Sequence, residues 1–259
     1  MWRVLARSVV GTSHRRLGAG CQDSYFVHRM SVGDDECLVI ACADGAGSAS
    51  EGAVGAALAC EAFCRCARDG LSAGLRMADV DQARMLAWYR QVRDDLLEEA
   101  ARRTLLVREL ACTLLTAIVS PRASVFAQVG DGAIVVGADQ HYQVATWPVS
   151  GEYANETTFI TADAFDRAFE FVRGPDRISE IAVLTDGLQR LALSYANRSV
   201  HAPFFAPMFQ ALLAAEDPDF LAADLERFLD SPAVNERTDD DKTLVLAIWS
   251  GSDGGAAAV

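Results

Sequence analysis

The sequence predicts an α+β fold in which two mainly antiparallel β-sheets pack together and carry helices on their outer faces. Strand-like stretches of the 259-residue chain come in groups separated by helical stretches, without strict alternation, which disfavours a doubly wound parallel sheet. In addition, 51% of the residues are hydrophobic and 23% are charged, which is typical of a globular domain with a sizeable core. We therefore expect one domain over residues 1–250 and a flexible tail over 251–259.

The first part of the chain predicts three strands followed by a pair of helices. Residues 2–10 alternate roughly between apolar and polar side chains, 23–30 carry aromatic and β-branched residues, and 37–43 form a continuous apolar run of buried-strand length. Residues 53–68 are alanine-rich with apolar positions at helical spacing, and 79–103 set such positions against a charged face. Both patterns are typical of amphipathic helices.

Strands return in the middle of the chain. Short stretches rich in β-branched residues are expected to form strands over 111–119, 124–129, 133–136 and 142–145. The tripeptide Gly130-Asp131-Gly132 separates two of these stretches, and we interpret it as a hairpin turn because Asp-Gly is a common turn signal.

The last part of the chain begins with a long irregular segment over 146–178, and connections of this length in a compact domain are often functional. A buried strand is expected over 181–184 and a final strand over 243–249. Helices are expected over 188–197, 203–215 and 220–230.

The formal charge of −13 argues against nucleic acid and anionic membranes as partners, because both attract basic surfaces. The seven cysteines are odd in number and most lie in apolar runs, which indicates reduced core thiols in a cytoplasmic protein. The N-terminal apolar stretch is short and contains Arg7, so it predicts a strand and no signal peptide. No run reaches the roughly 18 apolar residues that a membrane helix needs.

Aspartates stand at the ends of the predicted strands. Three hydrophobic runs each lead to an aspartate and a glycine, at Asp44, Asp131 and Asp186. Asp23 opens an early strand, and the acidic triplet 239–241 precedes the last one. Each aspartate alone has a local explanation as a turn residue or a helix cap. Together they would repel one another unless a hard cation lay between them, and oxygen ligands suit Mg²⁺ or Mn²⁺.

These aspartates lie within short motifs that follow one another along most of the chain. The motifs are Gln22-Asp23-Ser24, Asp44-Gly45-Ala46-Gly47-Ser48, Thr113, Gly130-Asp131-Gly132, Thr185-Asp186-Gly187-Leu188 and Asp240-Asp241-Lys242-Thr243. In this order they resemble the metal-dependent protein phosphatases of type 2C, and a bacterial branch of that family in particular. The resemblance extends over residues 8–249.

The resemblance implies a four-layer αββα sandwich, in which helix pairs flank two mainly antiparallel sheets, with a two-metal centre at one end. It implies that Asp44 bridges both ions, that the Gly45 carbonyl and Asp23 serve one ion, and that Asp186 and Asp240 serve the other. Asp44, Asp186 and Asp240 are therefore the candidate catalytic residues. By this resemblance, water activated by two Mn²⁺ or Mg²⁺ ions hydrolyses phosphoserine or phosphothreonine without a protein nucleophile.

Two further parts of the site have open alternatives. Asp131 resembles a residue that holds a weaker third ion in bacterial relatives, although a hairpin turn is sufficient to explain it. His14, Arg15 and Arg16 are candidates for binding phosphate. The alternatives are a structural histidine at His14 and a solvated turn at the two arginines.

The resemblance places the family's substrate-contacting flap in the segment 147–174. Its polar residues Glu152, Asn155 and Glu156 are candidates for contacting a phosphopeptide, and a plain surface loop is the alternative. The implied partners are a phosphorylated protein substrate and a cognate serine/threonine kinase. We expect a monomer with no nucleic-acid or membrane partner.

The sequence departs from the family pattern at three positions. Gln22 stands where the family often has a glutamate, Ala46 where some relatives have a histidine that protonates the leaving oxygen, and Gly18 where a phosphate-binding arginine often stands. These differences support an alternative function, that of a pseudophosphatase that binds a phosphoprotein or another partner without turnover. The retained aspartates favour an active enzyme.

Overall fold

Two five-stranded antiparallel sheets form the centre of the computed structural model, which describes residues 1–33, 35–148, 157–175 and 177–251. The β1 sheet has the order β1-β12-β9-β6-β7, formed by Trp2–Val9, Lys242–Trp249, Glu180–Leu184, Ala133–Ala138 and His141–Thr146. The β2 sheet has the order β2-β3-β4-β5-β8, formed by Ser24–Val32, Asp35–Ala43, Leu114–Ser120, Ala123–Val129 and Glu170–Arg173.

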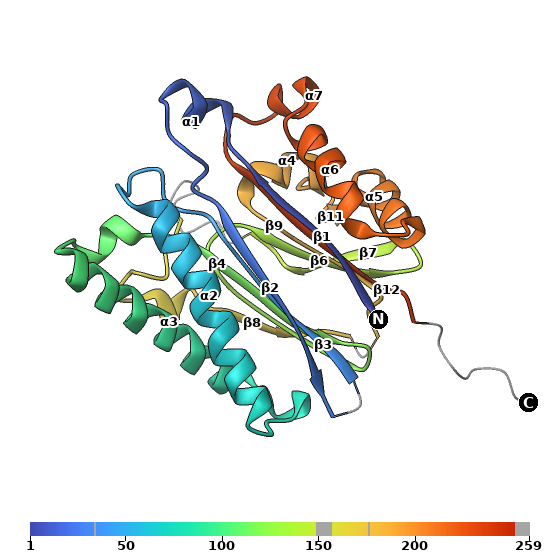
Figure 1. The fold of residues 1–259 in the computed structure, drawn as a ribbon, viewed down its shortest axis with the longest axis horizontal. Helices are drawn as coiled ribbons and strands as arrows, with labels where there is room; N and C mark the ends of the chain where they lie inside the picture. Colours follow the sequence, from blue (N-terminus) through green and yellow to red (C-terminus); the bar gives the residue numbers. More distant parts are fainter. Residues whose placement is uncertain (34, 149–156, 176, 252–259) are drawn as a thin grey trace, which may run out of the picture.

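Helices cover the outer face of each sheet, so the predicted αββα arrangement is confirmed (Figure 1). The β2 sheet is covered by α2 (Gly52–Ser72) and α3 (Gln82–Arg103). The β1 sheet is covered by α4 (Gln189–Ala192), α5 (Ala202–Ala214) and α6 (Ala222–Leu229). The smaller elements are α1 (Thr12–Arg16), α7 (Pro232–Asn235), the strands β10 (Leu193–Ser194) and β11 (Ser199–Val200), and 3₁₀ turns at Met77–Asp79, Val107–Leu110, Phe165–Arg167, Asp186–Leu188 and Pro218–Leu221.

Strand β3 explains how the core is divided. Its side chains alternate, so that Val39 and Ala41 pack in the cluster under α2 and α3 while Leu38 and Ile40 pack between the two sheets. All four side chains are fully buried. A strand that is covered on both faces needs apolar residues at every position, which is why the sequence shows a continuous run here.

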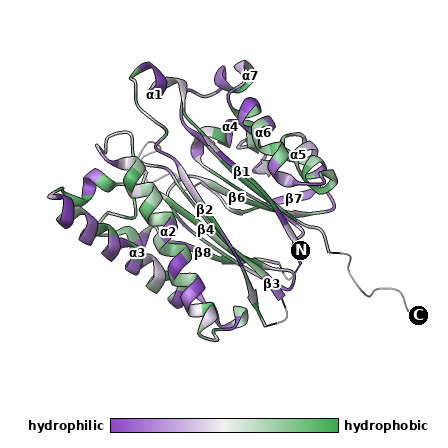
Figure 2. Ribbon diagram, in the orientation of Figure 1, coloured by the Kyte–Doolittle hydropathy of each residue, from purple (hydrophilic) through white to green (hydrophobic). Residues whose placement is uncertain are grey.

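Helix α3 shows the opposite pattern, with one buried and one exposed face. Met85, Tyr89, Val92 and Leu96 are buried at helical spacing, and the outward face is hydrophilic in Figure 2. The helix begins at Gln82, three residues later than expected, because the Asp81 side chain accepts a hydrogen bond from the N–H of Arg84 (2.8 Å) and caps the first turn.

The hairpin-turn interpretation of Gly130-Asp131-Gly132 is wrong. Strand β5 belongs to the β2 sheet and β6 to the β1 sheet, so this tripeptide carries the chain from one sheet to the other. The tight hairpin lies further along, between β6 and β7, where Asp139 and Gln140 have φ values of 51° and 64°. Two consecutive left-handed residues give the turn type that suits a two-residue hairpin.

Two other expectations are also corrected. The helix expected over 188–197 ends at Ala192, because Leu193 and Ser194 turn away to pair with β11. The segment expected to be irregular over 146–178 contains a 3₁₀ turn and β8, which pairs with β5 at the edge of the β2 sheet. Four residues give too short a pattern for the sequence to reveal such an edge strand.

The remaining expectations concern the cysteines, membrane-spanning helices, the C-terminal tail and the flap. All seven cysteines lie in the described ranges, and none of them forms a disulfide. Within those ranges, no helix has both the length and the apolar character needed to cross a membrane. Apart from Gly251, the expected tail lies outside the described residues, as do the flap candidates Glu152, Asn155 and Glu156.

Candidate metal centre

The five aspartates expected to bind metal converge at one end of the sheets. Asp44, Asp131 and Asp186 follow strands β3, β5 and β9. Asp23 and Asp240 precede strands β2 and β12, which run antiparallel to β3 and β9. The end of one antiparallel strand lies at the same edge as the start of its neighbour. All four of the other carboxyl groups are near enough to Asp44 to raise its pKa.

Asp44 is held at the centre of the group by Thr113. The backbone N–H of Asp44 donates to Thr113 Oγ1, and the N–H of Thr113 donates to the Asp44 carbonyl, both at 2.9 Å. Burial is the main cause that holds the pKa of Asp44 well above its usual range, and the neighbouring carboxyl groups add to this effect. Thr113 thus fixes the backbone from which this carboxyl group projects.

Gly45 joins the first two motifs through a very close backbone approach. Its N–H donates to the Gln22 carbonyl (3.1 Å), and a Cβ at this position would lie 2.5 Å from the Gly52 carbonyl carbon, so only glycine fits. With its amide nitrogen turned toward these oxygens, the Gln22 side chain donates to the carbonyls of Gly45 (3.0 Å) and Ala46 (3.3 Å). Gln22 therefore orients the carbonyl that the resemblance implies as a ligand.

Asp23 is buried and held by two threonines, Thr185 directly after β9 and Thr243 in β12. Its Oδ2 accepts hydrogen bonds from Thr185 Oγ1 (2.7 Å) and Thr243 Oγ1 (2.8 Å). Its Oδ1 has no hydrogen-bond partner among the described residues. Burial is the main cause that raises the pKa of Asp23 to about 7, while the threonine hydroxyls act in the opposite direction.

Asp186 starts the 3₁₀ turn after β9 and faces Asp44, with which it shares a side-chain hydrogen bond. Burial, followed by the charges of Asp131 and Asp240, raises the pKa of Asp186 to about 7. Its Oδ1 lacks a hydrogen-bond partner among the described residues. A Cβ on Gly187 would lie 2.0 Å from the Asp241 carbonyl oxygen, so glycine is needed for this turn to approach β12.

The acidic triplet before β12 divides into residues with different surroundings. Asp239 is exposed, and Asp240 faces the cluster, where burial is the main cause that raises its pKa. The Asp241 side chain is buried and turns the other way, accepting hydrogen bonds from the N–H groups of Gly11 (2.6 Å) and Gln22 (2.5 Å). Asp241 therefore ties the start of β12 to the segments that precede β2.

The candidates for binding phosphate lie in and beside α1. His14 Nδ1 is 3.0 Å from Asp241 Oδ2, and its Nε2 faces Gly47 of the second motif. Arg15 forms an ion pair with Asp230 (2.9 Å) in the segment after α6, and Arg16 is exposed. Of the three, the structure brings His14 to the border of the carboxylate cluster.

Asp131 lies at the crossing between the sheets, near the base of the predicted flap. Its Oδ2 accepts a hydrogen bond from Thr157 Oγ1 (2.6 Å), and its carbonyl accepts one from Gln189 Nε2. Asp131 therefore contacts a residue within the segment 147–174, where the flap is predicted. Its charge also helps to raise the pKa of Asp186.

The donor set fits hard divalent cations. It consists of carboxylates and a backbone carbonyl, and the unpartnered Oδ1 atoms of the buried Asp23 and Asp186 offer oxygens that the protein leaves unused. The described residues contain no preformed group of three His, Cys, Asp or Glu side chains at metal-binding distances. The charges of the four other aspartates all act on Asp44, so the five carboxyl groups lie near one another. The ligand roles of the individual residues stay predictions.

Sequence reasoning missed the supporting residues. Asp241, Thr185 and Thr243 lie within the recognised motifs, but their roles come from contacts between segments far apart in the chain. A threonine before one Asp-Gly pair and another at the start of the last strand were the available signals. Nothing in the local sequence shows that both hydroxyls reach the same carboxylate.

The buried aspartates predict how the stability of the metal-free protein depends on pH. The pKa values of Asp23 and Asp186 are raised to about 7, above the values in the unfolded chain. The folded protein therefore keeps protons that the unfolded chain releases, so the free energy of unfolding falls as the pH rises from about 4 to about 7. Urea unfolding with EDTA at about pH 5 and about pH 8 should give the lower value at pH 8. An equal or higher free energy at pH 8 would contradict this prediction.

Comparisons of the sequence with known proteins agree with one another. The family model described as protein phosphatase 2C matches residues 10–230. The chain is 42% identical over 253 residues to serine/threonine-protein phosphatase 3 of Escherichia coli (strain K12), and the match covers 96% of this chain and 99% of that protein.

Solved structures show the same fold at lower sequence identity. The serine/threonine phosphatase Stp1 from Staphylococcus aureus has a TM-score of 0.60 at 16% identity, covering 97% of this chain and 96% of that chain. The catalytic domain of the serine threonine protein phosphatase PstP, solved in complex with two manganese ions, has a TM-score of 0.60 at 16% identity. That match covers 95% of this chain and 97% of the PstP chain.

Proposed function

This chain belongs to the protein phosphatase 2C family of metal-dependent serine/threonine phosphatases, and we propose that its five clustered aspartates form the catalytic metal centre. The observation that carries the proposal is the convergence of these carboxyl groups, with raised pKa values at Asp23, Asp44 and Asp186. Several buried carboxyl groups that face one another are costly unless cations neutralise them.

In the proposed centre, Asp44 would be a ligand of both Mn²⁺ or Mg²⁺ ions, the Gly45 carbonyl and Asp23 would hold one of them, and Asp186 and Asp240 would hold the other. When bound, the two ions supply a water that is deprotonated near neutral pH and positive charge for the phosphoryl oxygens. Thr113 orients Asp44 through its two hydrogen bonds of 2.9 Å. In this layout the attacking group is water, so no serine, cysteine or histidine nucleophile is required.

The remaining site residues are proposed to bind and orient the substrate. His14 lies at the border of the cluster and offers Nε2 on the side of Gly47, where a phosphate oxygen could accept its proton in a hydrogen bond. Arg15 and Arg16 follow His14 directly in α1, where Arg15 pairs with Asp230 and Arg16 is exposed, and we keep them as secondary candidates for binding phosphate. Asp131 is proposed to hold a weaker third ion and, through Thr157, to position the flap.

We also propose that residues 1–250 act as one catalytic domain of a cytoplasmic monomer, opposite a serine/threonine kinase. The continuous sheets support the single domain, because β1 and β12 pair along their whole length, from Trp2 with Trp249 to Val9 with Lys242. The seven unpaired cysteines suit a reducing compartment. Phosphoproteins are the substrates of a serine/threonine phosphatase.

Removal of metal tests the proposed function directly. After treatment with EDTA and gel filtration, we expect the protein to hydrolyse neither p-nitrophenyl phosphate nor a phosphothreonine peptide. Addition of millimolar Mn²⁺ or Mg²⁺ should restore both activities, because the ions activate the water. If the folded protein hydrolysed neither substrate with Mn²⁺, the pseudophosphatase alternative would be favoured. Full activity in EDTA would contradict a metal centre.

Asp131→Asn is expected to lower kcat less than Asp44→Asn does. Asp131 is partly exposed and keeps contacts to Thr157 and Gln189 that asparagine can also make, so we expect kcat to fall by about tenfold. Asp44→Asn should have a far larger effect. Steady-state hydrolysis of the phosphothreonine peptide over a range of Mn²⁺ concentrations measures both variants. An Asp131→Asn enzyme as inactive as Asp44→Asn would assign Asp131 to the essential ligands.

A further inference from the structure

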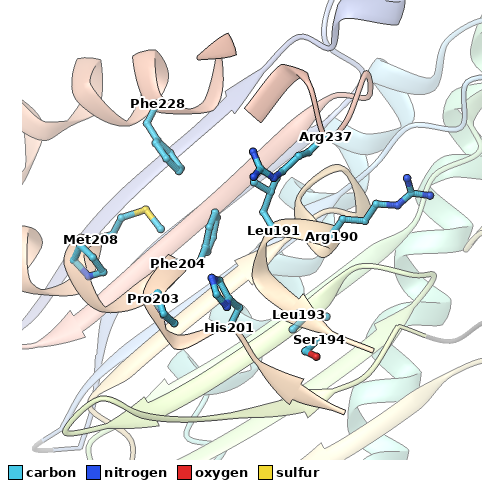
Figure 3. Close-up of a pocket in the computed structure, with 11 residues that line it drawn as sticks. Arg190, Leu191, Leu193, Ser194, His201, Pro203, Phe204, Met208, Phe228 and Arg237 are labelled. Carbon is cyan, nitrogen blue, oxygen red and sulfur yellow. The ribbon is translucent and has the colours of Figure 1, made fainter. Parts of the chain in front are cut away.

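A groove of about 590 Å³ opens on the helical side of the β1 sheet (Figure 3), and none of the five clustered aspartates lines it. Its walls come from α4, β10, α5 and α6 and from the segment after α7. Apolar side chains line one end, where the rings of Phe204 and Phe228 lie 5.9 Å apart and Met208 lies beside them. Phe228 is 40% exposed, so an occupant could bury more of it.

The groove is also basic. Arg190, His201 and Arg237 line it, and no acidic residue does. Neither arginine forms an ion pair in the described part of the chain, and Arg237 donates only to the Ala233 carbonyl (2.7 Å). By contrast, Arg227 on α6 pairs with Asp224. In a chain with a formal charge of −13, a groove with uncompensated positive charge is suited to an acidic ligand.

Two prolines of helix α5 also belong to this surface, and one of them interrupts the hydrogen bonding of the helix. Pro207 lies inside the helix and has no N–H to donate to the carbonyl of Pro203, one turn earlier. Both prolines line the groove.

The groove adjoins the catalytic end of the molecule. Helix α4 begins three residues after Asp186, and Arg190 on this helix lies at the opposite end of the groove from Phe228 (Figure 3). Tyr195 links the two sites, because it follows Ser194 of the groove and its hydroxyl donates to Gln189 Oε1, while Gln189 Nε2 donates to the Asp131 carbonyl. Burial and the charges of Asp131 and Asp186 raise its pKa, whereas Arg190 acts in the opposite direction. A chain that leaves the carboxylate cluster past Tyr195 therefore reaches Arg190 first.

We propose that this groove docks a segment of the phosphoprotein substrate that carries a bulky apolar side chain beside acidic residues, at a distance from the phosphorylated residue. The apolar side chain packs against the exposed part of Phe228 and against Phe204, and the acidic groups face Arg237 and Arg190. Docking raises the local concentration of the phosphorylated residue at the metal centre. This inference rests on the proposed phosphatase activity. It names a feature of the substrate that the metal centre itself does not contact.

A binding experiment tests the groove without turnover. The probes are two fluorescein-labelled, unphosphorylated peptides, Glu-Glu-Phe-Leu-Glu-Glu and Lys-Lys-Phe-Leu-Lys-Lys, measured by fluorescence anisotropy. We expect the acidic peptide to bind more tightly, and Arg237→Ala to weaken it by about tenfold, as for the loss of one charge-assisted contact. Phe228→Ser should also weaken it, and added salt should reduce the difference between the peptides.

Two matched variants control for general surface effects. Arg227→Ala removes an arginine of α6 that does not line the groove, and Phe220→Ser removes a phenylalanine that is 80% exposed outside it. Both should bind the acidic peptide like the unmodified protein. Equal binding of the two peptides, no binding up to about 1 mM, or an unchanged affinity in Arg237→Ala would overturn the proposal.

A measurement of turnover then tests whether the docked segment belongs to the substrate. Each probe sequence is joined to a phosphothreonine peptide through a flexible Gly-Ser linker. The acidic form should have the higher kcat/KM, and Arg237→Ala should remove this advantage without changing hydrolysis of p-nitrophenyl phosphate. An acidic peptide that binds but gives no advantage at any linker length would overturn the substrate assignment. Failure of p-nitrophenyl phosphate hydrolysis itself would count against the proposed catalytic centre, while the anisotropy result would still report on the groove.

Discussion

Asp44→Asn is expected to abolish hydrolysis of a phosphothreonine peptide, lowering kcat by at least about a thousandfold at saturating Mn²⁺. Asp44 lies at the centre of the carboxylate cluster, since the four neighbouring aspartates all act on its pKa. Asparagine has nearly the same shape but only one oxygen and no charge, so it cannot bridge two cations. Asp186→Asn should have an effect of the same order.

The same substitution should leave the metal-free protein folded and make it more stable. Burial and like charges hold the pKa of Asp44 well above its usual range, so the ionised carboxyl group is costly in the absence of cations. Thermal unfolding in EDTA at about pH 8 should therefore give a higher Tm for Asp44→Asn, and Mn²⁺ should raise the Tm of the unmodified protein much more than that of the variant. Asp94→Asn, on the exposed face of α3, is the matched control and should change neither quantity. An active Asp44→Asn enzyme would refute the site assignment.

Asp241→Ala is expected to lower the free energy of unfolding by about 3 kcal/mol, because it removes the acceptor from two enclosed N–H groups. These belong to Gly11 (2.6 Å) and Gln22 (2.5 Å), and His14 also loses its contact at 3.0 Å. Urea unfolding measures the loss. We also expect activity to need a higher Mn²⁺ concentration, since Gln22 orients the Gly45 carbonyl.

Asp239→Ala is the control for this second prediction. The Asp239 side chain is exposed, and its contacts to Ser13 are made through the backbone carbonyl, so alanine keeps them. The variant should stay within about 0.5 kcal/mol of the unmodified protein. If Asp241→Ala were equally mild, the tether between β12 and the N-terminal segments would not contribute to stability.

The parts of the fold that the sequence predicted well are those in which a local pattern reflects burial. The continuous apolar run of β3 and the helical spacing of α3 both follow directly from which faces are covered. The hairpin-turn interpretation of the tripeptide at Asp131 was wrong because it depended on packing that no local pattern reflects. An Asp-Gly pair predicts a reversal of the chain, but whether the next strand joins the same sheet depends on packing between distant segments.

In the candidate site, too, local patterns revealed some residues, while the roles of others depend on contacts between distant segments. Asp44 and Asp186 could be found because each follows a hydrophobic run, and the order of the motifs gave them a common meaning. Asp240 was predicted as a ligand from its place in the family motif, whereas no local pattern gave a role to Asp241 in the same acidic triplet. Their difference arises from long-range contacts: Asp241 meets N–H groups of residues 11 and 22, more than 200 positions earlier in the chain.

The pairing of β1 with β12 has a consequence for the order of synthesis. Strand β1 is made first, yet its neighbour in the β1 sheet is β12, the last strand made of those described. The sheet therefore cannot close, and Asp240 and Asp241 cannot arrive, until the ribosome has added residues 240–249. A nascent chain that still lacks this segment has neither its final core nor its full set of carboxylates. Dephosphorylation should thus begin in one step after this segment emerges, with no partly active intermediate on the ribosome.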